Sequence, residues 1–333
     1  MFDAGMFLSS SDSAYSGVAS FSTATGMSFL DVSYDGSTLV TGDGVSGAIR
    51  IYSNTSGTWS LQQTIGLAAN TYMGAIAVSS DGSYFVVNVM SPANTVYVYY
   101  KSASTWSLQQ TLTGPTGSVY FGWAVAIDDS GSIIAVSDPH NANGYGGGYQ
   151  RGCITTYTRS GTTWSLQQTI NNPDTGSYNG NFGFCISLSG DATTLASGCE
   201  GLQSAGNVFV YTYSSSWTQQ GSSLTSSRVN SIDVSHNGST LVLGYFSSGA
   251  ATVYTRSGTT WTSVGNLSSG TSYSVCISPD AAMIQSDGGV WSWNGTTSTY
   301  MQAVSAASSG AGYQGGVASF GSTHNTLATT IQS

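Results

Sequence analysis

The chain has very few charged side chains. Only 6% of its 333 residues are Asp, Glu, Lys or Arg, whereas ordinary soluble domains have about 25%. Six Lys and Arg stand against fifteen Asp and Glu, so the net charge is −9. Proteins that bind nucleic acid need clustered Lys and Arg to displace counterions from phosphates. The composition therefore argues against a nucleic-acid partner, and against attraction to anionic lipid for the same reason.

Long apolar runs are also missing. No stretch approaches about 18 consecutive apolar residues, which predicts no insertion into a membrane. The segment Met1–Gly5 lacks the positive charge and apolar run of a secretory signal, so we expect synthesis in the cytoplasm. A surface rich in Ser, Thr and Gly is nevertheless typical of proteins that work outside cells. Both features fit a virion component or another extracellular surface protein. A bacterial protein exported by a signal-independent route is the alternative.

Cysteine and histidine are scarce and scattered. The four cysteines form no Cys-x-x-Cys pair, which favours free, buried thiols. A Cys185–Cys199 disulfide is the alternative, because sequence alone cannot establish connectivity. The histidines are His140, His236 and His324, and they lack the spacing of a zinc site. We therefore predict no metal site and no cofactor.

A repeated segment is the most informative feature that is present. Thr-Trp-Ser-Leu-Gln-Gln-Thr-Ile occupies residues 58–65, and close copies occupy 105–112 and 163–170. Weaker copies follow at 216–220 and 260–263. Self-similarity at a period of roughly 20 to 50 residues indicates a solenoid, a propeller or an array.

Each repeat unit has the pattern of four antiparallel strands. An alternating strand leads into a polar turn such as Tyr34–Ser37 or Ser80–Ser83. Asp-Gly and Asn-Gly at these turns are strong hairpin signals, because Gly and Asn tolerate the positive φ that such turns require. A second strand, a variable loop, a third strand and a second turn precede the Trp-containing strand. Four antiparallel strands per unit make the blade of a β-propeller.

The unit count predicts the architecture. Six complete units span residues 26–66, 72–113, 120–171, 181–224, 228–267 and 271–304. The tail has a first and a second strand, and the head, at Gly5–Ser9 and Gly17–Phe21, has a third and a fourth. Residues 311–333 plus 1–25 would therefore close a composite blade and leave no exposed sheet edge. We predict one all-β domain over 1–333, a seven-bladed β-propeller of four-stranded antiparallel blades closed by N- and C-terminal strands. Six or eight blades are the alternatives.

The repeated tryptophans are predicted to lie on the outermost strand, where neighbouring blades diverge. The period of two places Trp59, Leu61 and Gln63 on one face, with Ile65 continuing it. A large ring fills the wedge between blades, and its N–H can still find a partner. The residues assigned this structural role are Trp59, Trp106, Trp164, Trp217 and Trp261.

The third unit resembles the FG-GAP repeat, the blade repeat of integrin α-chain heads and of many bacterial and viral surface proteins. The resemblance rests on Phe121–Ile127 with Ser132–Pro139, and Phe182-Gly183 opens the fourth unit in the same way. It implies a propeller with a role in cell adhesion or as a capsid-associated protein. Ser137-Asp138-Pro139 replaces the family's Gly-Ala-Pro. Integrin-type blades hold calcium in an Asp-x-Asp-x-Asp-Gly loop, but the acids here are isolated, so no calcium site is predicted.

Two long segments are the candidate binding loops. Residues 138–151 and 171–181 should lie on one face, around the third and fourth blades, where loop length exceeds the minimum. They are rich in Tyr, which gives rigid contact area, and in Asn, which gives adaptable hydrogen bonds. The candidate residues are Asp138, His140, Asn141, Asn143, Tyr145, Tyr149, Arg151, Asp174, Tyr178 and Asn179.

Catalytic machinery is not indicated. The chain has no Gly-x-Ser-x-Gly elbow, and its single Glu and scattered Asp do not suggest paired catalytic carboxylates. We therefore predict no catalytic residues and a non-enzymatic binding or attachment protein. Its expected partners are other protein subunits of an assembly or surface glycans. A purely structural scaffold subunit is one alternative. A propeller hydrolase or lyase, which would use a loop acid such as Asp138, is the other.

Overall fold

The computed structural model describes an all-β chain. The described residues are 2–11, 14–23, 28–43, 46–56, 58–67, 73–89, 94–142, 151–174, 180–199, 207–224, 227–245, 251–267, 274–278, 280–286, 289–302, 318–320 and 327–329, with side chains between 29 and 301. Every element in these ranges is a β-strand. They contain no helix with the length and apolar character needed to cross a membrane.

Six four-stranded antiparallel sheets, here called blades one to six, are each built from four consecutive strands. Blade one consists of β3 (Ser28–Val32), β4 (Thr38–Asp43), β5 (Ala48–Thr55) and β6 (Thr58–Gly66). Blade two consists of β7 (Ile76–Val78), β8 (Tyr84–Val89), β9 (Thr95–Ser102) and β10 (Thr105–Thr113). Blade three consists of β11 (Val125–Ile127), β12 (Ile133–Asp138), β13 (Cys153–Ser160) and β14 (Thr163–Asn171). Blade four consists of β15 (Phe182–Leu188), β16 (Thr194–Cys199), β17 (Val208–Tyr213) and β18 (Trp217–Gln219). Blade five consists of β19 (Val229–Val234), β20 (Thr240–Tyr245), β21 (Thr252–Ser257) and β22 (Thr260–Asn266). Blade six consists of β23 (Val275–Ile277), β24 (Met283–Ser286), β25 (Gly289–Trp293) and β26 (Ser298–Gln302).

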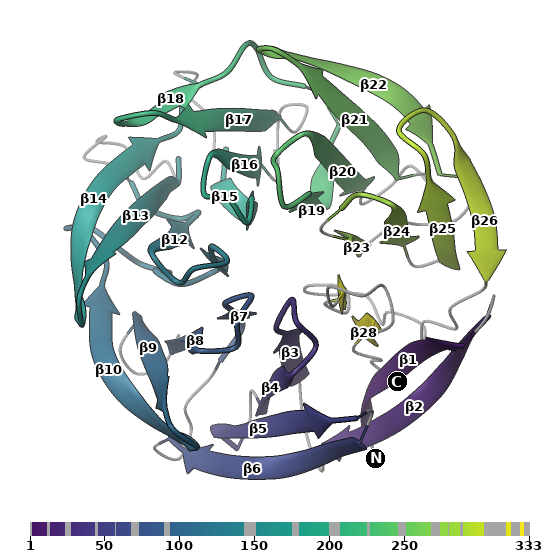
Figure 1. The fold of residues 1–333 in the computed structure, drawn as a ribbon. Coiled ribbons are helices and arrows are strands. Elements are labelled where there is room, and N and C mark those ends of the chain that lie inside the picture. The colour runs from purple at the N-terminus through teal and green to yellow at the C-terminus, as the bar shows by residue number, and fades with distance from the viewer. Residues whose placement is uncertain are drawn as a thin grey trace.

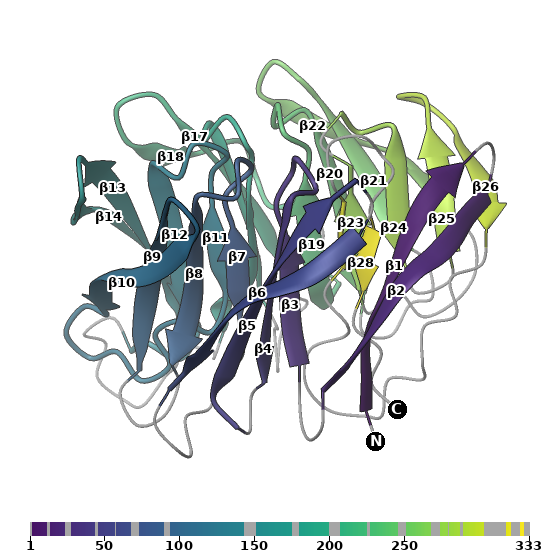
Figure 2. The same cartoon turned by 60° about the horizontal axis from the view of Figure 1, so that its bottom comes forward.

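The blades stand around a common axis, as in a β-propeller. The first strand of each blade lies nearest the axis, and the fourth lies at the circumference (Figure 1). In the turned view of Figure 2, the blades are seen as tilted sheets that follow one another around the ring. All these strands lie within the units predicted from the sequence. The structure is thus an all-β propeller of four-stranded antiparallel blades.

The two ends of the chain share a further four-stranded sheet, here called the terminal sheet. Its strands are β1 (Phe2–Ser11), β2 (Ala14–Thr23), β27 (Ala318–Phe320) and β28 (Leu327–Thr329), in the order β2-β1-β28-β27. Met6 to Leu8 of β1 pair with Thr329 to Leu327 of β28. The head therefore contributes the outer two strands and the tail the inner two, which is the pairing that the sequence predicts.

The core consists of apolar layers between adjacent blades. Ile49 and Ile51 of blade one pack with Phe85 and Val87 of blade two. Their side chains are almost fully buried, at 0–1% exposed. Burying a side chain of this size contributes about 1.5 to 3 kcal/mol. Each blade is therefore stabilised by its neighbour.

The hairpin between the first two strands of each blade is held by a serine paired with an aspartate or, in blade five, with an asparagine. In blade one, Ser33 Oγ donates to Asp35 Oδ1 at 2.6 Å and accepts from Thr38 N at 2.9 Å. Blade three exchanges the two residue types: Ser130 Oγ donates to Asp128 Oδ2 at 2.6 Å. At Asp81 burial raises the pKa, but hydrogen bonds from Ser79 and Ser83 outweigh burial and hold it below its usual value. The isolated acids of the turns thus close hairpins.

The repeated Trp segment joins neighbouring blades through what we call the Gln–Trp strap. Gln110 of blade two donates from Nε2 to the carbonyl of Trp164 in blade three, at 2.8 Å, and its Oε1 accepts from Trp164 N at 2.8 Å. Gln63 makes the same pair of bonds to Trp106, and Gln168 makes it to Trp217. Each strap therefore connects the outer strand of one blade to that of the next.

The motif tryptophans lie between blades. Trp106, Trp164 and Trp217 are each 3% exposed, whereas Trp59 and Trp261 are partly buried. The indole Nε1 of Trp164 donates to Gln109 Oε1 of the preceding blade at 2.9 Å. Basic side chains lie over three of these rings. They are Lys101 over Trp106, Arg159 over Trp164 and Arg256 over Trp261.

The prediction that Trp59, Leu61 and Gln63 lie on one face is wrong for the glutamine, which reaches Trp106 of the next blade. Leu61 is 53% exposed. Ile51 pairs with Gln63 while Tyr52 pairs with Leu61, so Gln62 is an extra residue in a β-bulge. A bulge interrupts the two-residue period. The same register shift occurs in β10 and β14, and Leu108 and Leu166 are exposed in the same way.

The two Phe-Gly pairs mark a close approach between blades. Phe121 and Phe182 are both fully buried. Gly122 and Gly183 have φ of 95° and 89°, where a Cβ is unfavourable. A Cβ on Gly183 would also lie 2.8 Å from Ser137 Cβ of blade three. Glycine is therefore required by both backbone conformation and packing.

Candidate functional site

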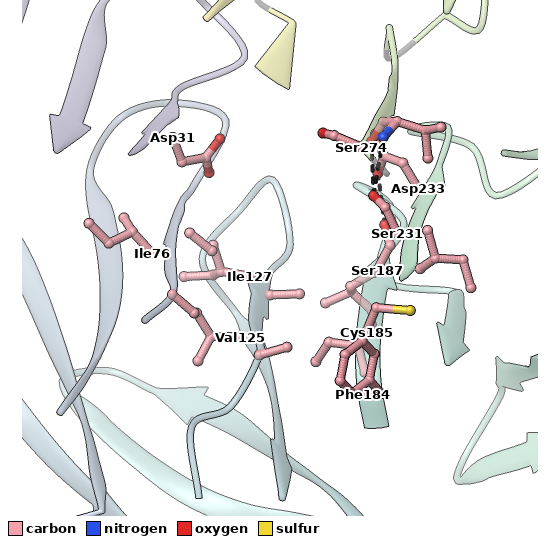
Figure 3. A pocket seen from close by; sticks show the side chains of 18 of the residues that line it. Asp31, Ile76, Val125, Ile127, Phe184, Cys185, Ser187, Ser231, Asp233 and Ser274 are labelled. Atoms are coloured by element: carbon pink, nitrogen blue, oxygen red, sulfur yellow. Dashed lines mark hydrogen bonds between the residues drawn. The ribbon is translucent and has the colours of Figure 1, made fainter. Parts of the chain in front are cut away.

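An axial cavity lies where the first strands of the blades converge. Its volume is about 300 Å³. It is lined by residues of β7, β11, β15 and β19 and of the segments beside them, with contributions from Asp31 of β3 and Val275 of β23. Its apolar walls include Ile76, Ile127 and Phe184 (Figure 3). The cavity is therefore lined by residues from the inner strands of six blades.

Two carboxylates contribute negative charge to this cavity. Asp31 and Asp233 lie on opposite sides of it (Figure 3). Asp31 Oδ2 accepts from Val78 N of the next blade at 2.8 Å. Asp233 Oδ2 accepts from Ile277 N at 2.9 Å, and its Oδ1 accepts from Ser187 Oγ at 2.9 Å. Each aspartate therefore connects the inner strands of adjacent blades.

Burial dominates the titration of Asp233. Desolvation raises its pKa from 3.8 to about 6, although hydrogen bonds from Ile277, Ser187 and Val234 act in the opposite direction. A raised carboxyl pKa means that the surroundings disfavour the charged form. Burial therefore outweighs the hydrogen bonds in setting the pKa of Asp233.

A second, smaller hollow of about 130 Å³ adjoins the cavity on the side of the hairpin turns. Asp129 makes two side-chain contacts in this hollow. Its carboxylate pairs with His236 Nδ1 and accepts a hydrogen bond from Ser80 Oγ. The Tyr34 ring stacks on His236, with 6.0 Å between ring centroids. Residues from blades one, two, three and five thus meet at this end of the axis.

This cluster differs from a Ser-His-Asp catalytic triad. In such a triad the imidazole lies between the hydroxyl and the carboxylate, so that it takes the proton of the hydroxyl. Here the Asp129 carboxylate lies between Ser80 and His236. The hydroxyl proton is held by a carboxylate, and the imidazole of His236 is not positioned to remove it. We assign the cluster a role in joining the turns.

An aromatic cluster lies beside the long loops of blades three and four. We call Tyr120, Trp123 and His140 the aromatic platform. The Tyr120 ring is 4.6 Å from His140, edge to face, and Trp123 stacks on His140 at 5.8 Å. Trp123 Nε1 donates to the carbonyl of Phe184 at 3.1 Å. Tyr120 remains 37% exposed and Val119 47% exposed.

The buried carboxylate of Asp138 holds the backbone of the segment that carries Tyr120. Asp138 is 1% exposed, and its two carboxylate oxygens accept from Val119 N at 3.0 Å and Tyr120 N at 3.1 Å. The structure therefore places this predicted binding residue in the interior, where it orients the loop that carries Tyr120.

The other predicted loop residues are divided between interior, surface and undescribed segments. Asn141 and Arg151 are 1% and 5% exposed, while His140 is partly buried and Asp174 is exposed. Arg151 contacts both loops through its backbone: its N–H donates to Asn141 O, and its carbonyl accepts from Asn172 Nδ2 at 2.9 Å. The bases of the two long loops are therefore adjacent. Predicted residues outside the described ranges are Asn143, Tyr145, Tyr149, Tyr178 and Asn179.

The cysteines are free thiols, so the alternative of a Cys185–Cys199 disulfide is wrong. Cys153, Cys199 and Cys276 are buried, and Cys185 is partly buried beside the axial cavity. Burial raises the pKa of the Cys153 thiol to about 12, with a further contribution from Asp138. Within the described ranges, no three His, Cys, Asp or Glu residues form a group that could hold a metal ion.

Sequence reasoning missed Tyr120, Trp123 and the two cavity aspartates as site residues. Tyr120 directly precedes the Phe121-Gly122 pair. Because Phe121 is buried, its neighbour in the sequence could have been predicted to be exposed. Asp31 and Asp233 carry no such signal, because only closure of the ring brings the first and fifth blades to one cavity.

No protein-family model and no curated protein matches this chain. Among solved structures, the chain is similar to a functionally unknown protein from Desulfotomaculum acetoxidans DSM 771. The TM-score is 0.61 at 11% sequence identity, over 90% of this chain and 95% of the other. At this identity the likeness concerns the fold alone, and it supports the class that the strands define, a β-propeller.

Proposed function

We propose that the protein is a non-enzymatic binding propeller that attaches to a protein partner on a virion or cell surface through blades three and four. The observation that carries this proposal is the aromatic platform, in which an exposed Tyr120 is held by two further rings and by the Asp138 carboxylate. Rigid aromatic side chains lose little entropy on binding and dominate contact energies at interfaces.

The chemistry beside Tyr120 favours a protein over a glycan as the partner. Val119, the neighbouring residue, is 47% exposed and apolar. An exposed aliphatic next to an aromatic anchor suits a dry interface core, whereas a sugar would require polar groups there. The low charge of the whole chain, 6%, supports a place on an external surface.

Site-specific photo-crosslinking tests this proposal. A photoreactive phenylalanine analogue at position 120 should capture one protein partner in the native particle or cell envelope. The matched control is position 100, because Tyr100 is 36% exposed but lies on β9 near its hairpin end. Equal capture at both positions would count against the platform. Capture at neither position would contradict a protein partner. Glycan-array binding that depends on Tyr120 would identify the partner as a glycan instead.

We further propose that the terminal sheet completes a ring of seven blades, and that the units are FG-GAP-like repeats. Strand β27 lies between β23 of blade six and β3 of blade one, and β2 contacts β26. The Phe-Gly geometry of blades three and four supports the repeat type, because Gly122 and Gly183 adopt the same left-handed conformation. Cryo-electron microscopy of the protein would count the blades directly.

A further inference from the structure

We propose that Asn237 and Asn294 are N-glycosylation sites, each carrying a sugar on the nitrogen of its side-chain amide. The inference rests on the proposed place of the protein on an external surface, but it does not depend on the aromatic platform or its partner. Asparagine accepts a sugar within the pattern Asn-x-Ser/Thr, where x is not proline. The pattern occurs at residues 54–56, 237–239, 266–268 and 294–296.

Asn237 is exposed in the turn between β19 and β20. Its Oδ1 accepts from Ser239 N at 3.0 Å and from Ser239 Oγ at 2.6 Å. The hydroxyl that the pattern requires therefore lies against the acceptor amide. Ser235 Oγ donates to the same oxygen at 3.0 Å, while the Nδ2 of Asn237 donates to no group among the described residues.

The hairpin itself does not need this amide nitrogen. Asp35, Asp81, Asp191 and Asp280 hold the same turn position in four other blades, where Oδ1 accepts from the serine two residues earlier. An aspartate has no amide nitrogen, and these hairpins close without one. The Nδ2 of Asn237 is therefore available for a reaction.

Asn294 has the same geometry in the turn between β25 and β26. It is exposed, and its Oδ1 accepts from Thr296 N and Thr296 Oγ1, both at 3.0 Å. Thr297 N donates to this oxygen at 2.8 Å. In the part of the chain that the structure describes, its Nδ2 likewise donates to no group.

The other two patterns are not assigned as sites. Asn54 is partly buried, and its Nδ2 donates to the carbonyl of Gly36 at 3.2 Å. This nitrogen is already engaged, so Asn54 serves as an internal control. The pattern that begins at Asn266 ends at Ser268, which lies outside the described ranges.

Both proposed sites lie at one end of the ring. In a four-stranded antiparallel sheet, the turns after the first and third strands are at the same end. Asn237 follows the first strand of blade five, and Asn294 follows the third strand of the neighbouring blade six (Figure 1). Tyr120 follows a fourth strand and His140 a second strand, so the platform is at the opposite end. Sugars at both sites would leave the platform accessible.

The modification is a glycosyl transfer from a sugar diphosphate. The Nδ2 atom attacks the anomeric carbon of the sugar, and the new C–N bond forms as the bond from that carbon to the diphosphate oxygen breaks. Nδ2 loses one proton and the diphosphate leaves. A separate transferase would catalyse this step, with the diphosphate linked to a lipid or to a nucleoside.

Peptide mapping by mass spectrometry tests both sites on the protein isolated from its native source. Hexose-containing adducts should occur on Asn237 and Asn294, and Asn54 should carry none. Either of two adducts supports the proposal: an oligosaccharide indicates a lipid-linked donor, and a single hexose indicates a nucleotide-linked one.

Variants expressed in the same source test the acceptor pattern. Asn237→Asp should lose the adduct and still fold, because aspartate holds that position in four other blades; circular dichroism checks the fold. Ser239→Ala should also lose the adduct, whereas Ser239→Thr, the matched control, should keep it.

Three results would overturn the proposal: unmodified Asn237 and Asn294 in the native protein, equal modification of Asn54, or an adduct that persists in Ser239→Ala. Crosslinking at position 120 reports on the platform alone, so its failure is distinct from each of these results.

Discussion

At the scale of single residues, Gln110 shows how one amide side chain connects two blades. Gln110→Ala leaves the N–H and carbonyl of Trp164 without the partners that they have at 2.8 Å. Because these groups are partly buried, we expect the free energy of unfolding to fall by about 1 to 3 kcal/mol. Urea denaturation measures this loss. Gln62→Ala removes only a 3.3 Å bond to Ser60 Oγ and should cost under about 0.5 kcal/mol. Equal losses would contradict the strap.

Asp233 makes a prediction about pH at the same scale. Its folded pKa, about 6, exceeds the ordinary 3.8, so the folded state binds this proton more tightly than the unfolded state. The contribution of this group to stability therefore falls as pH rises from about 4 to about 6 and is level above that window. Asp233→Asn cannot titrate and lacks this slope. Melting temperatures of both proteins across the window test this, and parallel profiles would show that Asp233 titrates normally.

At the scale of elements, the start of β15 depends on Gly183. Gly183→Ala places a Cβ 2.8 Å from Ser137 Cβ in a backbone conformation with φ of 89°. Strain and the clash together should cost about 2 kcal/mol or more. Gly161→Ala is the control: it also has positive φ, 60°, but no atom lies within 4 Å of its Cβ. Its cost should be about 1 kcal/mol. Chemical denaturation compares them, and equal costs would remove packing as the reason for glycine.

The same elements show why sequence predicts the blades better than their sites. Hairpin chemistry is local, so Asp35-Gly36 and Asn237-Gly238 locate their turns without knowledge of any partner strand. The bulge at Gln62 depends on register against β5, which composition does not reveal. Asp138 was predicted as a binding residue because it begins one of the two long loops, and functional residues concentrate in such loops. Its burial follows from two backbone N–H groups of a loop 18 and 19 residues away in sequence.

At the scale of the whole molecule, the joints around the ring are unequal. Straps or indole bonds connect blades one to five, the last through Trp261 Nε1 and Gln220 Oε1 at 2.8 Å. Blade five continues after Trp261 with Thr262-Ser263-Val264, which lacks the glutamine pair of the repeat. The glutamine side chains that bond to the next blade elsewhere are therefore missing between blades five and six. Closure between blade six and blade one depends more on the terminal sheet.

Removing the inner half of that sheet tests this dependence. Deletion of residues 318–333 takes away β27 and β28, which pair with β1 and contact β3 and β23. The edge of β1 and the inner face of blade one then lose their cover, and free strand edges promote association. We expect a melting temperature lower by roughly 10 °C or more, as a loss of about 5 kcal/mol would produce, and larger species in size-exclusion chromatography. Deletion of 330–333 alone spares the pairs from Leu327 to Thr329 and should change neither measurement. A long deletion that melts like the full chain would show that the six consecutive blades hold the ring without the terminal sheet.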